Sequence, residues 1–324
     1  MNPKWRLGGD FNGRVRYDEP MSSHTSWHAG GTADVFFTPR DVDDVANFLR
    51  TLPMEVPLYW VGLGSNLLVR DGGVRGVVIS TPGAFTRIER RSQTRIYSEA
   101  SVPCARIARN CANWGLSSCE FLGGIPGTLG GALAMNAGSF GDETWRHVIS
   151  IESIDRRGQR RTRQREEFKV GYRQVEWPQG EAQEWFLAAE MHFEPRTPAQ
   201  APAVQSLLQR RRETQPIGDW SCGSVFKNPP GDHAARLIET AGLKGYRIGD
   251  AVVSEKHANF IVNEGKAHAS ELEQLIEHVR AAVQDMYDIR LETEVRIIGE
   301  PLAADIPRVL PHVGAEISSN GGRC

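Results

Sequence analysis

Cysteine is scarce in this sequence. Only five of the 324 residues are cysteine, and no two of them form a C-x-x-C pair. Structural zinc sites and dithiol redox sites typically use such short spacings, so we expect no metal site. A few unpaired cysteines are typical of a reduced, cytoplasmic protein, whereas small secreted proteins are rich in them. We therefore predict a cytoplasmic location.

Long apolar runs and an excess of one charge are also missing. No run approaches the roughly 20 apolar residues that span a bilayer, and the N-terminus lacks an apolar stretch of signal-peptide length. The net charge of −2 gives no global attraction to nucleic acid or to anionic membranes. We expect a monomer that acts on a small molecule and binds neither nucleic acid nor membrane.

One basic segment needs a separate explanation. The run RRGQRRTRQR at 156–165 holds six arginines between two strand-like segments. Aromatic residues are not interleaved with basic ones as they are in single-strand binding proteins. We interpret the run as an exposed hairpin with solvated arginines rather than as a nucleic-acid site.

Helical and extended patterns alternate along the chain. Apolar residues recur at helical spacing in the segments 41–52, 103–112, 204–215, 232–242 and 270–288. Strand-like segments are 74–80, 94–100, 147–155, 184–193 and 291–299. Because the two kinds are interspersed, the class is α/β or α+β. A stretch rich in proline and alanine at 199–202 indicates a linker.

Glycine is concentrated in one region. Between Gly115 and Gly141 it occurs at eight positions, roughly four times the average usage of about 7%. A second glycine turn, GLGSN, lies at 62–66. Backbone amides in such turns bind anions. The two segments indicate either a phosphate-bearing cofactor held between two subdomains or simply a set of tight turns.

Two familiar nucleotide-binding motifs are absent. A Walker loop requires G-x-x-x-x-G-K-[ST], which does not occur here. A dinucleotide fingerprint requires three glycines, and Leu67 occupies the place of the third after Gly62 and Gly64. A cofactor bound across two subdomains by loop amides is the remaining nucleotide-binding interpretation.

Seven segments together resemble one family. The chain is similar to the UDP-N-acetylenolpyruvoylglucosamine reductases, and to their second subtype, which lacks a substrate-capping segment. The matching segments appear in family order and cover about residues 20–300. They are HAGGTAD (28–34), GLGSNLLV (62–69), GIPGTLGGALAMNAGSFGDE (124–143), GYR (171–173), SCGSVFKNP (221–229), AGLKGYRIGDAVVSEKHANFIVN (241–263) and LETEVRIIG (291–299).

The resemblance implies an α+β fold with a defined order of domains. A two-subdomain FAD-binding fold of the vanillyl-alcohol-oxidase (PCMH) type would precede a C-terminal α/β substrate-binding domain. We expect an N-terminal extension at 1–19, FAD-binding subdomains at 20–80 and 81–198, the substrate domain at 199–300 and a tail at 301–324.

The resemblance also implies a reaction. In this family NADPH reduces FAD, and the reduced flavin then reduces an enolpyruvyl ether on a UDP-sugar to a lactyl ether, for peptidoglycan synthesis. One site would serve NADPH and then the UDP-sugar. Two alternatives stay open: a related flavin oxidase acting on another small molecule, and a nucleotide-sugar sensor without activity.

The resemblance assigns three catalytic residues. Ser224 corresponds to the proton donor, and Arg173 to the arginine that stabilises the intermediate. Strand alternation places Glu292, Glu294 and Arg296 on one face, so spacing cannot choose between the glutamates. The E-V-R pattern of the family selects Glu294 as the third catalytic residue.

The resemblance assigns binding residues as well. The flavin side would consist of Gly30, Gly31, Gly62, Gly64, Ser65, Asn66, Gly124, Ile125, Gly127, Gly131, Asn136, Ala137 and Gly138. Substrate-binding candidates are Tyr172, Lys227, Asn228, His257 and Asn259. Of these, His257 and Asn259 could equally brace a turn.

Overall fold

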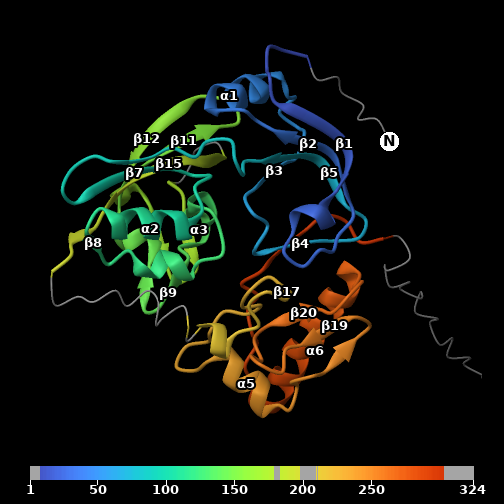
Figure 1. Ribbon diagram of the computed structural model, residues 1–324. Helices are drawn as coiled ribbons and strands as arrows, with labels where there is room; N and C mark the ends of the chain where they lie inside the picture. Colours follow the sequence, from blue (N-terminus) through green and yellow to red (C-terminus); the bar gives the residue numbers. More distant parts are fainter. Residues whose placement is uncertain (1–7, 179–182, 198–208, 210, 303–324) are drawn as a thin grey trace, which may run out of the picture.

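The computed structural model describes residues 8–178, 183–197, 209 and 211–302. Three sheets form three parts of the molecule (Figure 1). Their strand orders are β1-β2-β5-β3, β12-β11-β15-β7-β6 and β17-β20-β19-β18. The mixture of antiparallel sheets, one partly parallel sheet and separate helices confirms the α+β class. Among the described residues, no helix is both long and apolar enough to cross a membrane.

The first part is a four-stranded sheet with one covering helix. Its elements are β1 (Arg14–Pro20), β2 (Thr32–Thr38), α1 (Val42–Thr51), β3 (Leu58–Val61) and β5 (Val74–Ser80). Asp41 caps α1 by accepting a hydrogen bond from the Asp44 amide at 2.8 Å. Strand β1 pairs with β2 from Arg14 onward. The first sheet therefore begins inside the segment that was expected to be an N-terminal extension.

The second part is a five-stranded antiparallel sheet with helices against it. Its strands are β6 (Ile88–Arg90), β7 (Arg95–Glu99), β11 (Val148–Asp155), β12 (Arg160–Gln164) and β15 (Glu184–His192). The helices are α2 (Cys104–Asn113) and α3 (Leu129–Met135). Short pairs add β8 (Leu116–Ser117) with β16 (Glu194–Pro195), β9 (Gly138–Ser139) with β10 (Asp142–Glu143), and β13 (Lys169–Gly171) with β14 (Gln174–Glu176).

The arginine run differs from its prediction in one respect. It does form a hairpin, made by β11 and β12, but two of its arginines are buried. The Arg156 guanidinium donates to the Pro53 carbonyl at 2.7 Å and so joins the second part to the first. Arg163 pairs with buried Glu184 at 2.6 Å. Burial with partners, rather than solvation, explains these two positions.

The third part packs a sheet against a long helix. It contains β17 (Trp220–Ser221), α5 (Ala234–Thr240), β18 (Arg247–Ile248), β19 (Ala251–Val253), β20 (Ile261–Asn263) and α6 (Ala269–Tyr287). Leu272, Leu275, Ile276, Val279 and Val283 of α6 are buried in its core at helical spacing. Half of the helix predicted at 204–215 (204–208 and 210), and the linker predicted at 199–202, lie outside the described residues, and residues 211–214 are helical as predicted.

The first and third parts are interlocked. The predicted strand 291–299 is shorter than expected, because only β21 (Arg296–Ile298) is extended, and it pairs in parallel with β4 (Leu67–Val69) of the first part. Trp27 is fully buried in the core of the third part, and its indole donates to the Ile261 carbonyl at 2.8 Å. Asp71 accepts hydrogen bonds from the first amides of α6. Figure 1 shows β4 beside the third part.

Candidate active site

A large cavity lies where the three parts meet. Its volume is about 1280 Å³, which exceeds the range of about 300–1,000 Å³ that is typical of a single small-molecule site. Residues from all three parts line it. The cavity is therefore large enough for a dinucleotide cofactor together with a second ligand.

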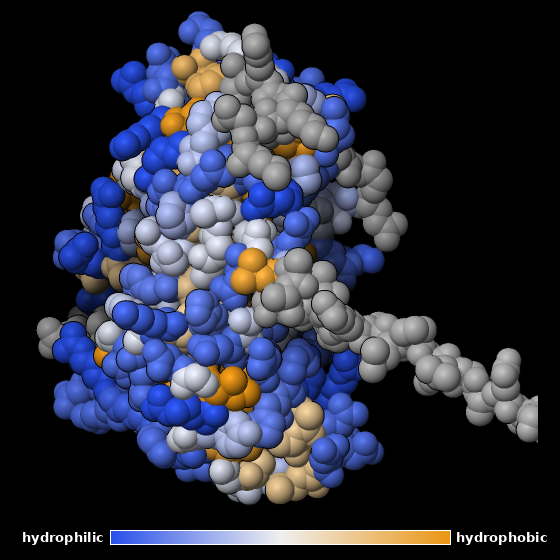
Figure 2. Space-filling view, turned by 90° about the vertical axis from the view of Figure 1, so that its right-hand side faces the viewer, coloured by the Kyte–Doolittle hydropathy of each residue, from blue (hydrophilic) through white to orange (hydrophobic). Residues whose placement is uncertain are grey.

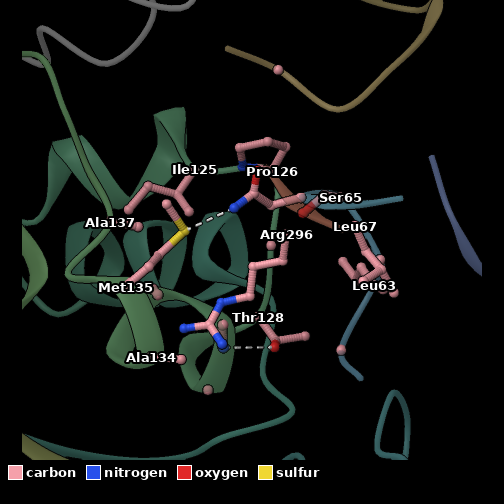
Figure 3. A pocket seen from close by; sticks show the side chains of 18 of the residues that line it. Leu63, Ser65, Leu67, Ile125, Pro126, Thr128, Ala134, Met135, Ala137 and Arg296 are labelled. Atoms are coloured by element: carbon pink, nitrogen blue, oxygen red, sulfur yellow. Dashed lines mark hydrogen bonds between the residues drawn. The ribbon is translucent and has the colours of Figure 1, made fainter. Parts of the chain in front are cut away.

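The two glycine segments approach each other closely in the wall of this cavity. A Cβ atom placed on Gly62 would lie 2.8 Å from Thr128 Oγ1, and one on Gly127 would lie 3.4 Å from Ser65 Oγ. Figure 3 shows Leu63 and Leu67 of the first segment on one side and Ile125 of the second on the other, with Arg296 between them. The close approach of the two backbones explains why side chains are missing here.

The local sequence determines the shape of both segments. Gly64 has a φ of +65°, and a Cβ atom there would collide with the His24 carbonyl oxygen. Thr128 caps α3, with its hydroxyl accepting a hydrogen bond from the Gly131 amide at 3.5 Å. Each segment is thus held in a turn whose backbone forms part of the cavity wall.

Most of the predicted flavin-side residues line the cavity. Those in its lining are Gly62, Gly64, Ser65, Asn66, Gly124, Ile125, Gly127, Gly131, Ala137 and Gly138. Gly30 and Gly31 are not in the lining. They allow their backbone to pass against Val69 and Asp71, where a Cβ atom would collide. Asn136 is also outside the lining and is 1% exposed.

Another part of the cavity wall carries charge. Arg173 lies at the tip of the β13–β14 hairpin with a φ of +54°, a conformation that costs energy for a residue other than glycine. Its Nε donates to Glu294 Oε1 at 3.0 Å. Its Nη2 donates to the Gly138 carbonyl at 2.9 Å. The structure thus brings together two predicted catalytic residues that are 121 positions apart.

Ser224 lies on a loop directly bonded to the segment of Glu294. The Glu294 amide donates to the carbonyl of Val225, the next residue after Ser224, at 2.8 Å. Ser224, Arg173 and Glu294 all line the same cavity. All three predicted catalytic residues therefore share one wall, although they come from different parts of the fold.

Burial dominates the electrostatics of this wall. It raises the pKa of Glu294, an effect that the charges of Arg173 and Lys227 oppose. Burial and the nearby Glu294 carboxylate also raise the pKa of the Cys222 thiol well above its usual range. Cys222 is therefore a neutral thiol in the wall, and Glu294 is protonated at a higher pH than an exposed glutamate.

The predicted substrate-binding residues are not in the cavity lining. Lys227 pairs with Glu292, Nζ to Oε2, at 3.3 Å. Asn228 Oδ1 accepts a hydrogen bond from the Ala234 amide at the start of α5. His257 Nδ1 accepts one from the Asn259 amide, and burial lowers the pKa of this histidine. Tyr172 is exposed at the hairpin tip, where the Arg173 guanidinium lies 5.1 Å from its ring.

The sequence analysis missed several residues of the lining. Trp60 and Trp185 stack with ring centroids 5.3 Å apart, and Trp177 lies on the same wall. Arg211 donates to the Gly124 carbonyl of the glycine run. Arg296 follows Glu294 in the ETEVRIIG segment, so alternation along that strand was a usable signal. No signal in the sequence identified the tryptophans, because their segments meet only in the fold.

The described residues do not meet the requirements of a metal site. Within residues 8–178, 183–197, 209 and 211–302, no group of three or more His, Cys, Asp or Glu side chains is placed to hold a metal ion.

Two family models match the chain. Residues 33–163 match the FAD binding domain, and residues 215–298 match the C-terminal domain of UDP-N-acetylenolpyruvoylglucosamine reductase. The first match covers both glycine segments, and the second covers Ser224 and Glu294. The second match begins at residue 215, just before β17 of the third part, while residues 164–214 lie in neither match.

Proteins of known name are similar over most of the chain. UDP-N-acetylenolpyruvoylglucosamine reductase of Alkalilimnicola ehrlichii is 53% identical over 89% of this chain and 96% of its own length. The enzyme of the same name from Methylococcus capsulatus is 52% identical over 88% of this chain and 93% of its own. The crystal structure of UDP-N-acetylenolpyruvylglucosamine reductase from Thermus caldophilus has a TM-score of 0.74, is 31% identical, and covers 88% of this chain and 98% of that one.

Proposed function

The chain belongs to the UDP-N-acetylenolpyruvoylglucosamine reductase family, and from that premise we propose that Ser224, Arg173 and Glu294 carry out its reaction. The enzyme is an NADPH-dependent flavoprotein. It reduces the enolpyruvyl ether of UDP-N-acetylglucosamine to UDP-N-acetylmuramate in peptidoglycan precursor synthesis. The Arg173–Glu294 pair in the cavity wall is the observation that carries the assignment of residues.

The cavity fits FAD. Eight glycines line it, and at Gly62 a side chain would fill the space between the two loops. The loops at 62–66 and 124–131 would hold the cofactor through their backbones. When bound, FAD supplies hydride transfer, which is the cofactor's own chemistry. The residues of the chain provide binding, charge and a proton.

Arg173 is proposed to hold the carboxylate of the enolpyruvyl group. A guanidinium has five N–H donors, and Arg173 uses three of them, toward Glu294, the Asn136 carbonyl and the Gly138 carbonyl. Two donors are thus available for a carboxylate that gains negative charge during reduction. A permanently charged group held by three bonds costs little reorganisation at the moment of reaction.

Glu294 is proposed to act in its protonated form. A substrate carboxylate beside it would add negative charge and raise further a pKa that burial already raises. A neutral carboxyl can donate a hydrogen bond to the developing enolate, as Arg173 does from the other side. Together the two residues would stabilise the intermediate.

Ser224 is proposed to deliver the proton to the carbon that bears the carboxylate. Its loop is bonded to the Glu294 segment, so the hydroxyl and the stabilising pair act on one group. A serine hydroxyl is a weak acid, and it requires an electron-rich acceptor such as an enolate carbon. The alkoxide left on Ser224 would then take a proton from solvent. The Lys227 amine pairs with Glu292 and is not in the cavity lining.

Several finer points belong to the same proposal. Tyr172, at the tip of the hairpin, and Asn228 are the predicted substrate residues that are exposed. We propose that the enzyme works as a monomer in the cytoplasm, where its nucleotide-sugar substrate is soluble. Figure 2 supports this, because one face of the molecule is largely hydrophilic, with small separate hydrophobic spots. Light scattering of the purified protein tests the monomer.

The two half-reactions test the function. The purified enzyme without oxygen should lose its flavin absorbance on addition of NADPH and regain it on addition of the enolpyruvyl UDP-sugar. A flavin oxidase of the same fold would be reoxidised by oxygen and not by the UDP-sugar. A sensor without activity would not bleach. Either result would contradict the proposal.

A further inference from the structure

Three asparagines are bonded to the segments of the proposed catalytic residues. From the sequence all three were candidate ligand contacts, although Asn259 could equally brace a turn. Asn66 and Asn136 were expected to touch the flavin, and Asn259 the substrate. Asn136 and Asn259 are instead 1% and 4% exposed. The side chains of all three make hydrogen bonds inside the protein, each to a segment that carries one catalytic residue.

Asn136 holds the hairpin of Arg173. Its Nδ2 donates to the Gly171 carbonyl at 2.9 Å and to Glu143 Oε2 at 3.0 Å, while its Oδ1 accepts from the Trp145 amide. Its backbone carbonyl accepts from Arg173 Nη1 at 3.3 Å. The residue has a φ of +47° at the end of α3. One asparagine thus fixes both the hairpin and the guanidinium.

Asn66 holds the strand of Glu294 from the opposite loop. Its Nδ2 donates to the Glu294 carbonyl at 3.0 Å. Its backbone carbonyl accepts from the Arg296 amide at 3.1 Å, which continues into the pairing of β21 with β4. The glycine loop of the first part is therefore bonded to the backbone of Glu294 itself and to that of Arg296, two residues further along.

Asn259 holds the loop of Ser224. Its Oδ1 accepts from the Phe226 amide at 3.0 Å, and its Nδ2 donates to the Phe226 carbonyl at 2.8 Å. Its backbone carbonyl accepts from the Val225 amide at 2.9 Å. An asparagine side chain carries one donor group and one acceptor group, so it can make this pair of hydrogen bonds to the backbone of one residue.

We propose that Asn66, Asn136 and Asn259 are positioning residues for Glu294, Arg173 and Ser224, respectively. The inference rests on the proposed catalytic roles of those three residues. A static wall of this kind matters because misplacement by about 1 Å can reduce a rate by about 100-fold. Asn136 and Asn259 are outside the cavity lining, so they act on the reduction of the UDP-sugar and not on the reduction of the flavin. Asn66 lines the cavity, so its effect on the UDP-sugar step is measured relative to its effect on flavin reduction.

The test compares the two half-reactions in single variants of the flavin-loaded enzyme. The variants are Asn66→Ala, Asn136→Gly and Asn259→Ala; glycine preserves the left-handed backbone of residue 136. Anaerobic stopped-flow measurements should show reoxidation by the UDP-sugar slowed by about 10- to 100-fold in all three variants. Flavin reduction by NADPH should stay within about twofold of wild type in Asn136→Gly and Asn259→Ala, and in Asn66→Ala it should change less than reoxidation does. The limiting rate should fall more than the apparent substrate affinity.

Asn263→Ala is the matched control. Asn263 is 3% exposed, and its Nδ2 donates to the Trp27 carbonyl at 2.8 Å, but it does not line the cavity. The control should lower the melting temperature as much as the other variants while leaving both half-reactions unchanged. Flavin content and thermal unfolding are measured for every variant. If the Asn136 and Asn259 variants do not fold, the reoxidation rate of Asn66→Ala still tests the proposal, because Asn66 is only half-buried.

A double-mutant cycle distinguishes positioning from a general loss of stability. Asn136→Gly should have little additional effect on reoxidation in an Arg173→Lys background, because both changes act through one guanidinium. Additive effects, unchanged reoxidation, or equal slowing of both half-reactions would overturn the positioning roles. If Arg173→Lys, Ser224→Ala and Glu294→Gln themselves leave reoxidation unchanged, the proposed catalytic roles fail instead.

Discussion

The two walls of the cavity are built in different ways. The flavin side is formed by backbone from two glycine segments, each nearly continuous in sequence. The catalytic side is formed by single side chains at positions 173, 224 and 294, on three different segments. A wall of backbone requires only turns of the right conformation. A wall of charged side chains also requires that several parts of the fold hold their relative positions.

The largest expected effect is on the rate of reoxidation by the UDP-sugar, which depends on the catalytic wall and not on the flavin side. The Ser224→Ala variant should slow reoxidation of the reduced enzyme by the enolpyruvyl UDP-sugar by about 10²- to 10⁴-fold, because the proton donor is removed. Reduction by NADPH and flavin content should stay at the level of wild type. Rapid-mixing absorbance measurements follow both steps. Equal loss in both steps would show that Ser224 belongs to the flavin side.

The pH dependence sharpens the account of the catalytic wall. Burial raises the pKa of Glu294 while Arg173 and Lys227 oppose the shift, and neutral Cys222 faces the same carboxyl. If protonated Glu294 is the active form, the reoxidation rate falls by about tenfold per pH unit once the pH exceeds that raised pKa. Stability contributed by the protonated group is likewise lost as the pH rises through the folded-state pKa.

Two glutamine variants test whether Glu294 causes this fall of the reoxidation rate at high pH. Glu294→Gln should remove the alkaline fall in the rate profile, because an amide does not ionise. Glu292→Gln should retain it, since the side chain of Glu292 is 76% exposed and pairs with Lys227. A fall that persists in the Glu294→Gln variant assigns the titration to another group.

A smaller effect is expected on the flavin side. A Cβ atom on Gly127 would enter the cavity wall 3.4 Å from Ser65 Oγ, an ordinary contact for the fold itself. Gly127→Ala should therefore weaken flavin binding by about tenfold with little change in the free energy of unfolding. Fluorescence titration of the flavin-free protein measures the affinity.

Gly115→Ala should lower stability without weakening flavin binding, the reverse of Gly127→Ala. Gly115 has a φ of +71° with open space around it, and it does not line the cavity. The variant should lose about 1 kcal/mol of unfolding free energy because alanine is strained at this φ. Its flavin affinity should be unchanged. If both variants lose flavin equally, binding depends on stability rather than on the glycine wall.

The smallest effect concerns the contact that joins the first and third parts. Asp71→Ala removes the acceptor for the Ala269 and Ser270 amides at the start of α6. Denaturant unfolding should show a loss of about 1 kcal/mol. Asp285→Ala, at an exposed position of the same helix, should change stability by less than about 0.5 kcal/mol. A loss of the same size in both would remove the capping role of Asp71.

Secondary structure was largely predictable where local patterns were strong. The strand predicted at 74–80 is β5, and the helix predicted from Ser270 is α6, which begins at Ala269. The helix predicted at 103–112 is α2. The prediction for 291–299 was less accurate, because only three residues pair as a strand and the backbones of Glu292 and Glu294 bond instead to Lys227 and Val225.

The candidate site was predictable to different extents on its two sides. Turn-forming glycines carry their own conformational signal, so the loops at 62–66 and 124–131 were identified from sequence. Asn136 was placed among them by sequence proximity, although its neighbours Ala137 and Gly138 line the cavity and it does not. The direction of a side chain at a left-handed helix end depends on its partners, here Gly171 and Glu143.

The sequence by itself determined the family and placed eight of the ten cavity-lining candidates in two short loops, and it supplied Arg173, Ser224 and Glu294 as the proposed catalytic residues, because short motifs carry these signals. The tertiary structure decided how they act together. It set the Arg173–Glu294 pair, the raised pKa of Glu294 and the burial of Arg156 and Arg163. These properties depend on distances between segments that are far apart in the chain. Local propensity and spacing hold no information about such distances.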